Sequence, residues 1–168
     1  MEEVLAPKRW SEVVFCGFGE PTERLDLLLK IAKWIRKRCP DLPIRLDTNG
    51  HGYALNKGRD VIKELKAAGV TSVSVSLNGH NEETYLENCR PTFSGAFETI
   101  LDFIRKAKRE MDVEISAVRM PEVDLQKVKA VADALGERRK VEIVEALRLY
   151  KKAGTPESLE SVQRICLG

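Results

Sequence analysis

The sequence of 168 residues contains no run of about 18 apolar residues, which a membrane-spanning helix would need. It has no large excess of either charge, because 28 basic and 26 acidic residues leave a net charge of only +2. A signal peptide pattern is also missing, since the chain begins Met1-Glu2-Glu3 and no apolar stretch follows. We therefore expect neither a membrane nor a nucleic acid as partner, and we expect a cytoplasmic location.

Local metal-binding and catalytic motifs are absent as well. The cysteines, Cys16, Cys39, Cys89 and Cys166, lie far apart, and none forms a C-x-x-C pair, so we expect free thiols and no metal site. No Walker loop, H-E-x-x-H helix or serine–histidine–acid arrangement is present, and no catalytic residue can be assigned. Charged residues make up 32% of the chain, which favours a thermophilic source.

What the sequence does contain is an alternation of β-branched runs and amphipathic helices. Strands are predicted at Glu12–Cys16, Ile44–Thr48, Ser72–Leu77 and Asp112–Val118, and helices at about Thr22–Cys39, Arg59–Ala68, Thr92–Glu110 and Val123–Leu135. Gly69 is a predicted C-terminal helix stop. This order is typical of parallel βα units, which form either a partial barrel or a doubly wound sheet. Charged positions on strands, Asp47 and Glu114, favour the barrel, because its interior tolerates charge better.

The pattern changes after Gly136. We therefore divide the chain into an α/β domain at 1–136 and a helical extension at 137–168, with helices from about Val141 to Ala153 and from Glu157 to Leu167.

Four polar loops would meet at the carboxyl ends of the four strands, where parallel sheets place their binding groups. They contain Gly17, Gly19, Glu20 and Pro21; Asp47 to Gly52; Ser76 to Asn81; and Ser116 to Pro121. Simpler interpretations remain open for single residues. Asn49-Gly50 and Asn78-Gly79 are ordinary turn pairs, Glu20 suits the first turn of a helix, and Cys16 suits the core. The two histidines, His51 and His80, are more typical of solvated loop positions than of direct roles.

Three segments together resemble radical S-adenosylmethionine (SAM) proteins, in the branch associated with TatD-type nucleases. They are Phe15 to Thr22, Arg45 to Gly50 and Ser74 to Asn78, and the stretch from Glu83 to Pro91 is similar too. The resemblance implies a partial (βα)6 barrel whose glycine-rich turn, Gly17, Gly19, Glu20 and Pro21, binds the amino group of SAM. It also implies that Thr48, Asn49, Ser76 and Asn78 lie near the SAM or substrate pocket.

The sequence departs from this family at the C-x3-C-x2-C loop, whose cysteines bind three irons of a [4Fe–4S] cluster. That loop is absent, and Met1 falls just before the equivalent of the family's second strand. We therefore expect a truncated radical-SAM-like chain, either a fragment or a natural remnant, which is inactive alone. A cluster is expected only if a missing amino-terminal segment supplies its ligands.

Two other interpretations stay open. The chain is either a non-catalytic binding or scaffold module for a small molecule, or a metal-independent enzyme that uses Glu20, Asp47 and His51. A sheet that lacks its first strand also has an exposed edge at Val13, Val14 and Phe15. Such an edge favours a homodimer, unless the carboxyl-terminal helices cover it.

Overall fold

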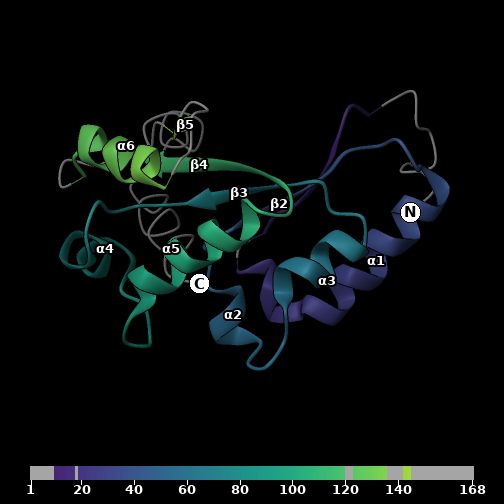
Figure 1. Cartoon of the computed structure of the whole chain (residues 1–168), viewed down its shortest axis with the longest axis horizontal. Coiled ribbons are helices and arrows are strands. Elements are labelled where there is room, and N and C mark those ends of the chain that lie inside the picture. Colours follow the sequence, from purple (N-terminus) through teal and green to yellow (C-terminus); the bar gives the residue numbers. More distant parts are fainter. Residues whose placement is uncertain (1–9, 18, 120–122, 136–141, 145–168) are drawn as a thin grey trace, which may run out of the picture.

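A parallel five-stranded sheet, with helices packed along it, organises the molecule (Figure 1). The computed structural model describes residues 10–17, 19–119, 123–135 and 142–144. The elements in chain order are β1 (Val13–Phe15), the 3-10 helix η2 (Pro21–Arg24), α1 (Leu25–Arg38), β2 (Ile44–Thr48), α2 (Gly52–Leu55), α3 (Val61–Ala67), β3 (Ser72–Ser76), α4 (Glu82–Cys89), α5 (Ala96–Ala107), β4 (Asp112–Val118), α6 (Leu125–Ala134) and β5 (Glu142–Val144).

The strand order β1-β2-β3-β4-β5 follows the sequence without reversal, and every pair is parallel. Right-handed crossovers that always step in one direction place their helices on one side of the sheet. Figure 1 shows α1, α2, α3 and α5 gathered along one side of the strands. A doubly wound sheet would reverse its order at a switch point. The fold is therefore an α/β partial barrel, as the sequence predicted.

The two faces of the sheet differ sharply in polarity. Alternate residues of β2 and β4 point into the helix-covered core, among them Ile44, Leu46 and Ile115, which are fully buried. The opposite face is polar and partly exposed. There, the Arg45 guanidinium makes ion pairs with Glu12 at 3.3 Å, Asp47 at 3.5 Å and Glu114 at 4.0 Å. The predicted location of Asp47 and Glu114 inside an open barrel agrees with this arrangement.

Several helix boundaries follow from local chemistry. Gly69 ends α3 with φ of +99°, a conformation that favours glycine, which confirms the predicted helix stop. Asn81 begins α4 with a capping box, because its side chain accepts from the Thr84 amide at 2.9 Å while the Thr84 hydroxyl accepts from the Asn81 amide. Asp124 caps α6 in a similar way.

The structure differs from the sequence-based prediction in three places. Residues 142–144, predicted as helix, form β5 and pair with β4, since the β-branched pair Ile143 and Val144 suits a strand beside an open neighbour. The rest of the predicted carboxyl-terminal helices lies outside the described residues. Second, α2 and α4 were not predicted, because helices this short bury few apolar positions. Third, α5 begins at Ala96, since Gly95 adopts φ of +72°.

No helix in the described ranges is long and apolar enough to cross a membrane.

Candidate functional site

The loops at the carboxyl ends of the strands enclose a cavity of about 260 Å³. This volume lies just below the roughly 300–1,000 Å³ that is usual for small-molecule sites. All eight binding residues predicted from the sequence line it, together with five others. The full set is Cys16, Gly17, Gly19, Glu20, Pro21, Asp47, Thr48, Asn49, Ser76, Asn78, Tyr85, Cys89 and Val118. The topology therefore brings the first three predicted loops and the end of β4 together at one place.

Glu20 joins the first loop to the second. Its Oε1 accepts from the Thr22 amide at 3.0 Å, the Thr22 hydroxyl at 2.7 Å and the Thr48 hydroxyl at 2.8 Å. Its Oε2 accepts from the Asn49 amide at 2.7 Å. The side chain is only 6% exposed, so these four donors replace most of the water that the carboxylate would otherwise bind. Glu20 is thus the N-cap of η2 and also a bridge between two loops.

The second loop uses its polar side chains to hold its own backbone. The Thr48 hydroxyl accepts from the Gly50 amide at 3.0 Å, and the Asn49 Oδ1 accepts from the His51 amide at 2.9 Å. Gly50 has φ of +79°, and a Cβ there would lie 3.1 Å from Ile100 and 3.2 Å from Val75. The Asn49-Gly50 pair is therefore a turn required by the fold, as the simpler interpretation held, and it also places Thr48 beside Glu20.

Asn78 ties the third loop to β4. Its Oδ1 accepts from the Val118 amide at 3.0 Å, and its backbone carbonyl accepts from the Asn88 side chain at 3.3 Å. Asn78 is 5% exposed, whereas Ser76 is half-buried at the wall of the cavity. The fourth predicted loop is described only as far as Arg119, because residues 120–122 lie outside the described ranges.

Gly17 and Gly19 differ from the other glycines of the site. Neither has a positive φ, and a Cβ built on either would meet no atom of the described residues within 4 Å. By contrast, a Cβ on Gly79 would lie 2.6 Å from the Tyr85 amide nitrogen. Neither backbone conformation nor packing in the described part of the chain thus requires glycine at positions 17 and 19. Both glycines line the cavity, so their bare backbone leaves room for a ligand.

A buried aromatic pair, Tyr85 and His51, adjoins the cavity, and Tyr85 lines it. Tyr85 on α4 is 2% exposed, and its hydroxyl lies 3.1 Å from His51 Nε2. Burial lowers the pKa of His51 from 6.5 to about 4, so its imidazole is neutral at physiological pH. The ring also contacts Phe93 edge-on, with 4.9 Å between centroids. His51 is therefore a core histidine, which corrects the expectation of a solvated loop position.

Sequence analysis named Tyr85 only within the similar stretch from Glu83 to Pro91 and did not assign it to the site, because α4 has no apolar stripe. Cys16 was expected in the core, but β1 ends at Phe15 and Cys16 is exposed at the cavity. His80 is half-buried and does not line the cavity. Glu20 and Asp47 both line the cavity, but His51 does not. The three residues expected to act together in a metal-independent enzyme therefore do not share one site.

A larger groove of about 590 Å³ lies between α3 and α5. Its lysines already make ion pairs, Lys63 with Asp60 at 2.8 Å and Lys106 with Asp102 at 2.7 Å. The lining is thus a salt-bridged surface, which differs from the loop-built cavity at the strand ends. Among the described residues, no group of three or more His, Cys, Asp or Glu side chains could hold a metal ion.

Comparison with known proteins identifies a family for most of the chain. Residues 1–135 match the family model of the radical SAM superfamily. A GTP 3',8-cyclase from Paenarthrobacter nicotinovorans is 43% identical over 75 residues, which are 45% of this chain and 19% of that protein. An uncharacterised protein of Methanocaldococcus jannaschii is 26% identical over 140 residues, which are 83% of this chain and 46% of that protein. The chain thus spans less than half the length of each of these relatives.

Proposed function

The chain belongs to the radical SAM superfamily, and from that premise we propose that the cavity at the strand ends binds SAM. The observation that carries the proposal is the pair of glycines, Gly17 and Gly19, which the described fold does not require and which face the cavity. Space left open beside a backbone, next to a buried carboxylate, suits the amino acid end of such a ligand.

The other lining residues fit the same ligand. Backbone groups of Gly17 and Gly19 would hold the amino group, with the Glu20 charge close behind and Pro21 fixing the turn. Thr48, Asn49, Ser76 and Asn78 would surround the ribose or an adjoining substrate. In this family SAM, when reduced, supplies the radical that starts the reaction. The substrate of this chain is not assigned, and its placement in the TatD-associated branch is part of the proposal.

A [4Fe–4S] cluster does not fit the described residues. Cluster cysteines must converge on one small volume. Only Cys16 and Cys89 line the cavity, and the described residues hold no group of three ligands. We therefore propose that the isolated 168-residue chain binds SAM without a cluster. Radical chemistry would then need cysteines from residues beyond those described here or from another chain.

SAM titration of the purified chain, followed by NMR, tests the proposal. Without a cluster to chelate the ligand, we expect a Kd on the order of 0.1 mM, equivalent to about 5 kcal/mol. Gly17→Ala and Gly19→Ala place a methyl group in the cavity, and we expect each to weaken binding by about tenfold or more. Their free energies of unfolding should stay within about 0.5 kcal/mol of the wild type, because the added Cβ meets nothing in the described fold.

Gly79→Ala is the control for the stability measurement. Its added methyl group would collide with the backbone of Tyr85, and we expect a loss of about 1–3 kcal/mol in stability. If the wild type binds no SAM, the proposed function is wrong. If Gly17→Ala and Gly19→Ala bind SAM as tightly as the wild type, the ligand does not occupy this cavity.

A further inference from the structure

The Glu20 carboxylate is held by a residue that does not itself line the cavity. Thr22 is fully buried, and both its amide and its hydroxyl donate to Glu20 Oε1, at 3.0 and 2.7 Å. Two donors from one rigid turn fix the oxygen in direction as well as in distance. The other oxygen, Oε2, then points to the Asn49 amide in the second loop.

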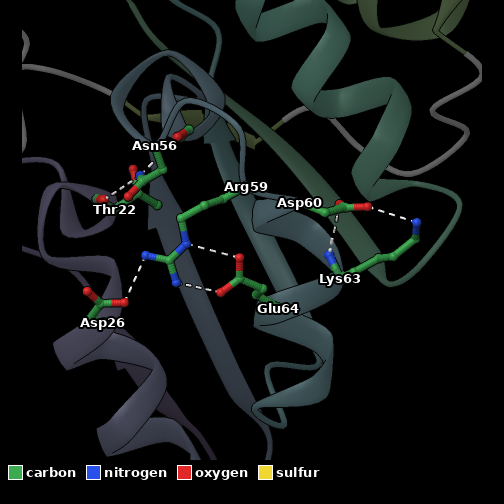
Figure 2. A network of polar contacts seen from close by, with 8 residues as sticks. Thr22, Asp26, Asn56, Arg59, Asp60, Lys63 and Glu64 are labelled. Atoms are coloured by element: carbon green, nitrogen blue, oxygen red, sulfur yellow. Dashed lines mark hydrogen bonds and ion pairs between the residues drawn. The ribbon is translucent and has the colours of Figure 1, made fainter.

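Thr22 is in turn anchored from the far side by Asn56. The Asn56 Nδ2 donates to the Thr22 carbonyl at 2.9 Å and to the Gly52 carbonyl at 3.0 Å (Figure 2). A Cβ on Gly52 would lie 3.5 Å from the Thr22 methyl group, so the Thr22 side chain packs beside Gly52. Thr22 therefore has hydrogen bonds on both sides and packs against α2.

The segment that carries Asn56 is braced as well. Arg59, three positions later, donates to Asp26 of α1 at 2.8 Å and through its Nε to Glu64 of α3 at 3.0 Å. Figure 2 shows Arg59 reaching between these two helices, with Asn56 directed at Thr22. These contacts form a continuous path from the outer helices through Asn56 and Thr22 to Glu20, and from there to Thr48 and Asn49.

We propose that Thr22 and Asn56 are positioning residues that set the Glu20 carboxylate and, through it, the relative placement of the first and second loops. The consequence for SAM affinity rests on the function proposed above. The positioning itself does not, because the Asn49 amide reports the Glu20 position whether or not a ligand is bound.

The experiment compares Thr22→Val, which removes the hydroxyl and keeps the size, with Thr22→Ser, which keeps the hydroxyl. Asn56→Asp removes both side-chain donations. NMR measures the shift and the hydrogen-exchange rate of the Asn49 amide, and SAM titration measures affinity. For Thr22→Val and Asn56→Asp we expect an upfield shift of the Asn49 amide proton and exchange about tenfold faster, which is about 1.4 kcal/mol of local protection. SAM should bind about tenfold more weakly, and Thr22→Ser should stay within about threefold of the wild type.

Thr99→Val is the control, because the Thr99 hydroxyl on α5 donates to the carbonyl of Gly95, the residue before this helix, and neither residue lines the cavity. It should leave both measurements unchanged. An Asn49 amide that keeps its wild-type shift and exchange rate in Thr22→Val and Asn56→Asp would overturn the positioning role. A wild type that binds no SAM would refute the proposed function alone, since the Asn49 readout would still decide this inference.

Discussion

Replacing Glu20 by glutamine tests whether the carboxylate joins the two loops. The change keeps the shape of the side chain, but an amide has one oxygen where the carboxylate has two. Oε1 and Oε2 each accept from a backbone amide, Thr22 at 3.0 Å and Asn49 at 2.7 Å. In either orientation of the glutamine, its NH2 group therefore faces one backbone N–H, which loses its acceptor.

The expected loss is large for a substitution this small. Hydrogen bonds to a charged group contribute about 1.5–3 kcal/mol, and a buried unsatisfied donor costs about 1–3 kcal/mol. Because Glu20 is 6% exposed, water cannot replace most of the lost hydrogen bonding. We expect Glu20→Gln to lower the free energy of unfolding by about 2–4 kcal/mol, and the Tm by roughly 5–12 °C for a domain of this size.

Urea and thermal unfolding followed by circular dichroism measure both quantities. Glu23→Gln is the control, since Glu23 is exposed in the same 3-10 turn and loses only surface charge. A Glu20→Gln protein as stable as Glu23→Gln, within about 0.5 kcal/mol, would show that the carboxylate does not hold the loops together.

Two further predictions concern the core and the sheet edge. Because burial lowers the His51 pKa from 6.5 to about 4, the unfolded chain binds a proton that the folded chain excludes. The contribution of His51 to stability should therefore be complete above about pH 6.5 and fall by about 3 kcal/mol toward pH 4. Urea unfolding should find this pH-dependent component missing in His51→Gln. At the edge, Val13–Phe15 pairs only with β2 among the described strands, so we expect concentration-dependent dimers. Sedimentation of the full chain that finds only monomers at high concentration would contradict this.

The sequence predicted the sheet well because its signals were local. The bounds of β2 and β4 match their apolar alternation, and the charged positions Asp47 and Glu114 indicated a polar barrel interior. The convergence of the loops followed from parallel topology, whereas the choice of the eight lining residues came from the resemblance to a known family. Their hydrogen bonds did not, since Glu20 meets Thr48 and Asn49 across nearly thirty positions of chain.

Prediction failed where tertiary contacts decide the outcome. The pairing of β5 with β4 depends on a neighbour that the helical periodicity of its own segment does not reveal. The burial of His51 depends on Tyr85, a residue in a helix too polar to be recognised. Likewise, Cys16 follows an apolar strand, but whether it is buried depends on where the strand ends.

The polar face around Arg45 limits what can cover the sheet. Three carboxylates, those of Glu12, Asp47 and Glu114, share one guanidinium, so the group carries an excess of negative charge. Removing ions from water costs several kcal/mol each unless new partners replace the solvent. An apolar segment, or the apolar surface of a misfolded neighbour, offers no such partners, so covering the face with it would incur the whole desolvation cost. Stacking of copies face to face is thereby disfavoured, and any molecule that settles there must bring hydrogen-bond donors or positive charge of its own.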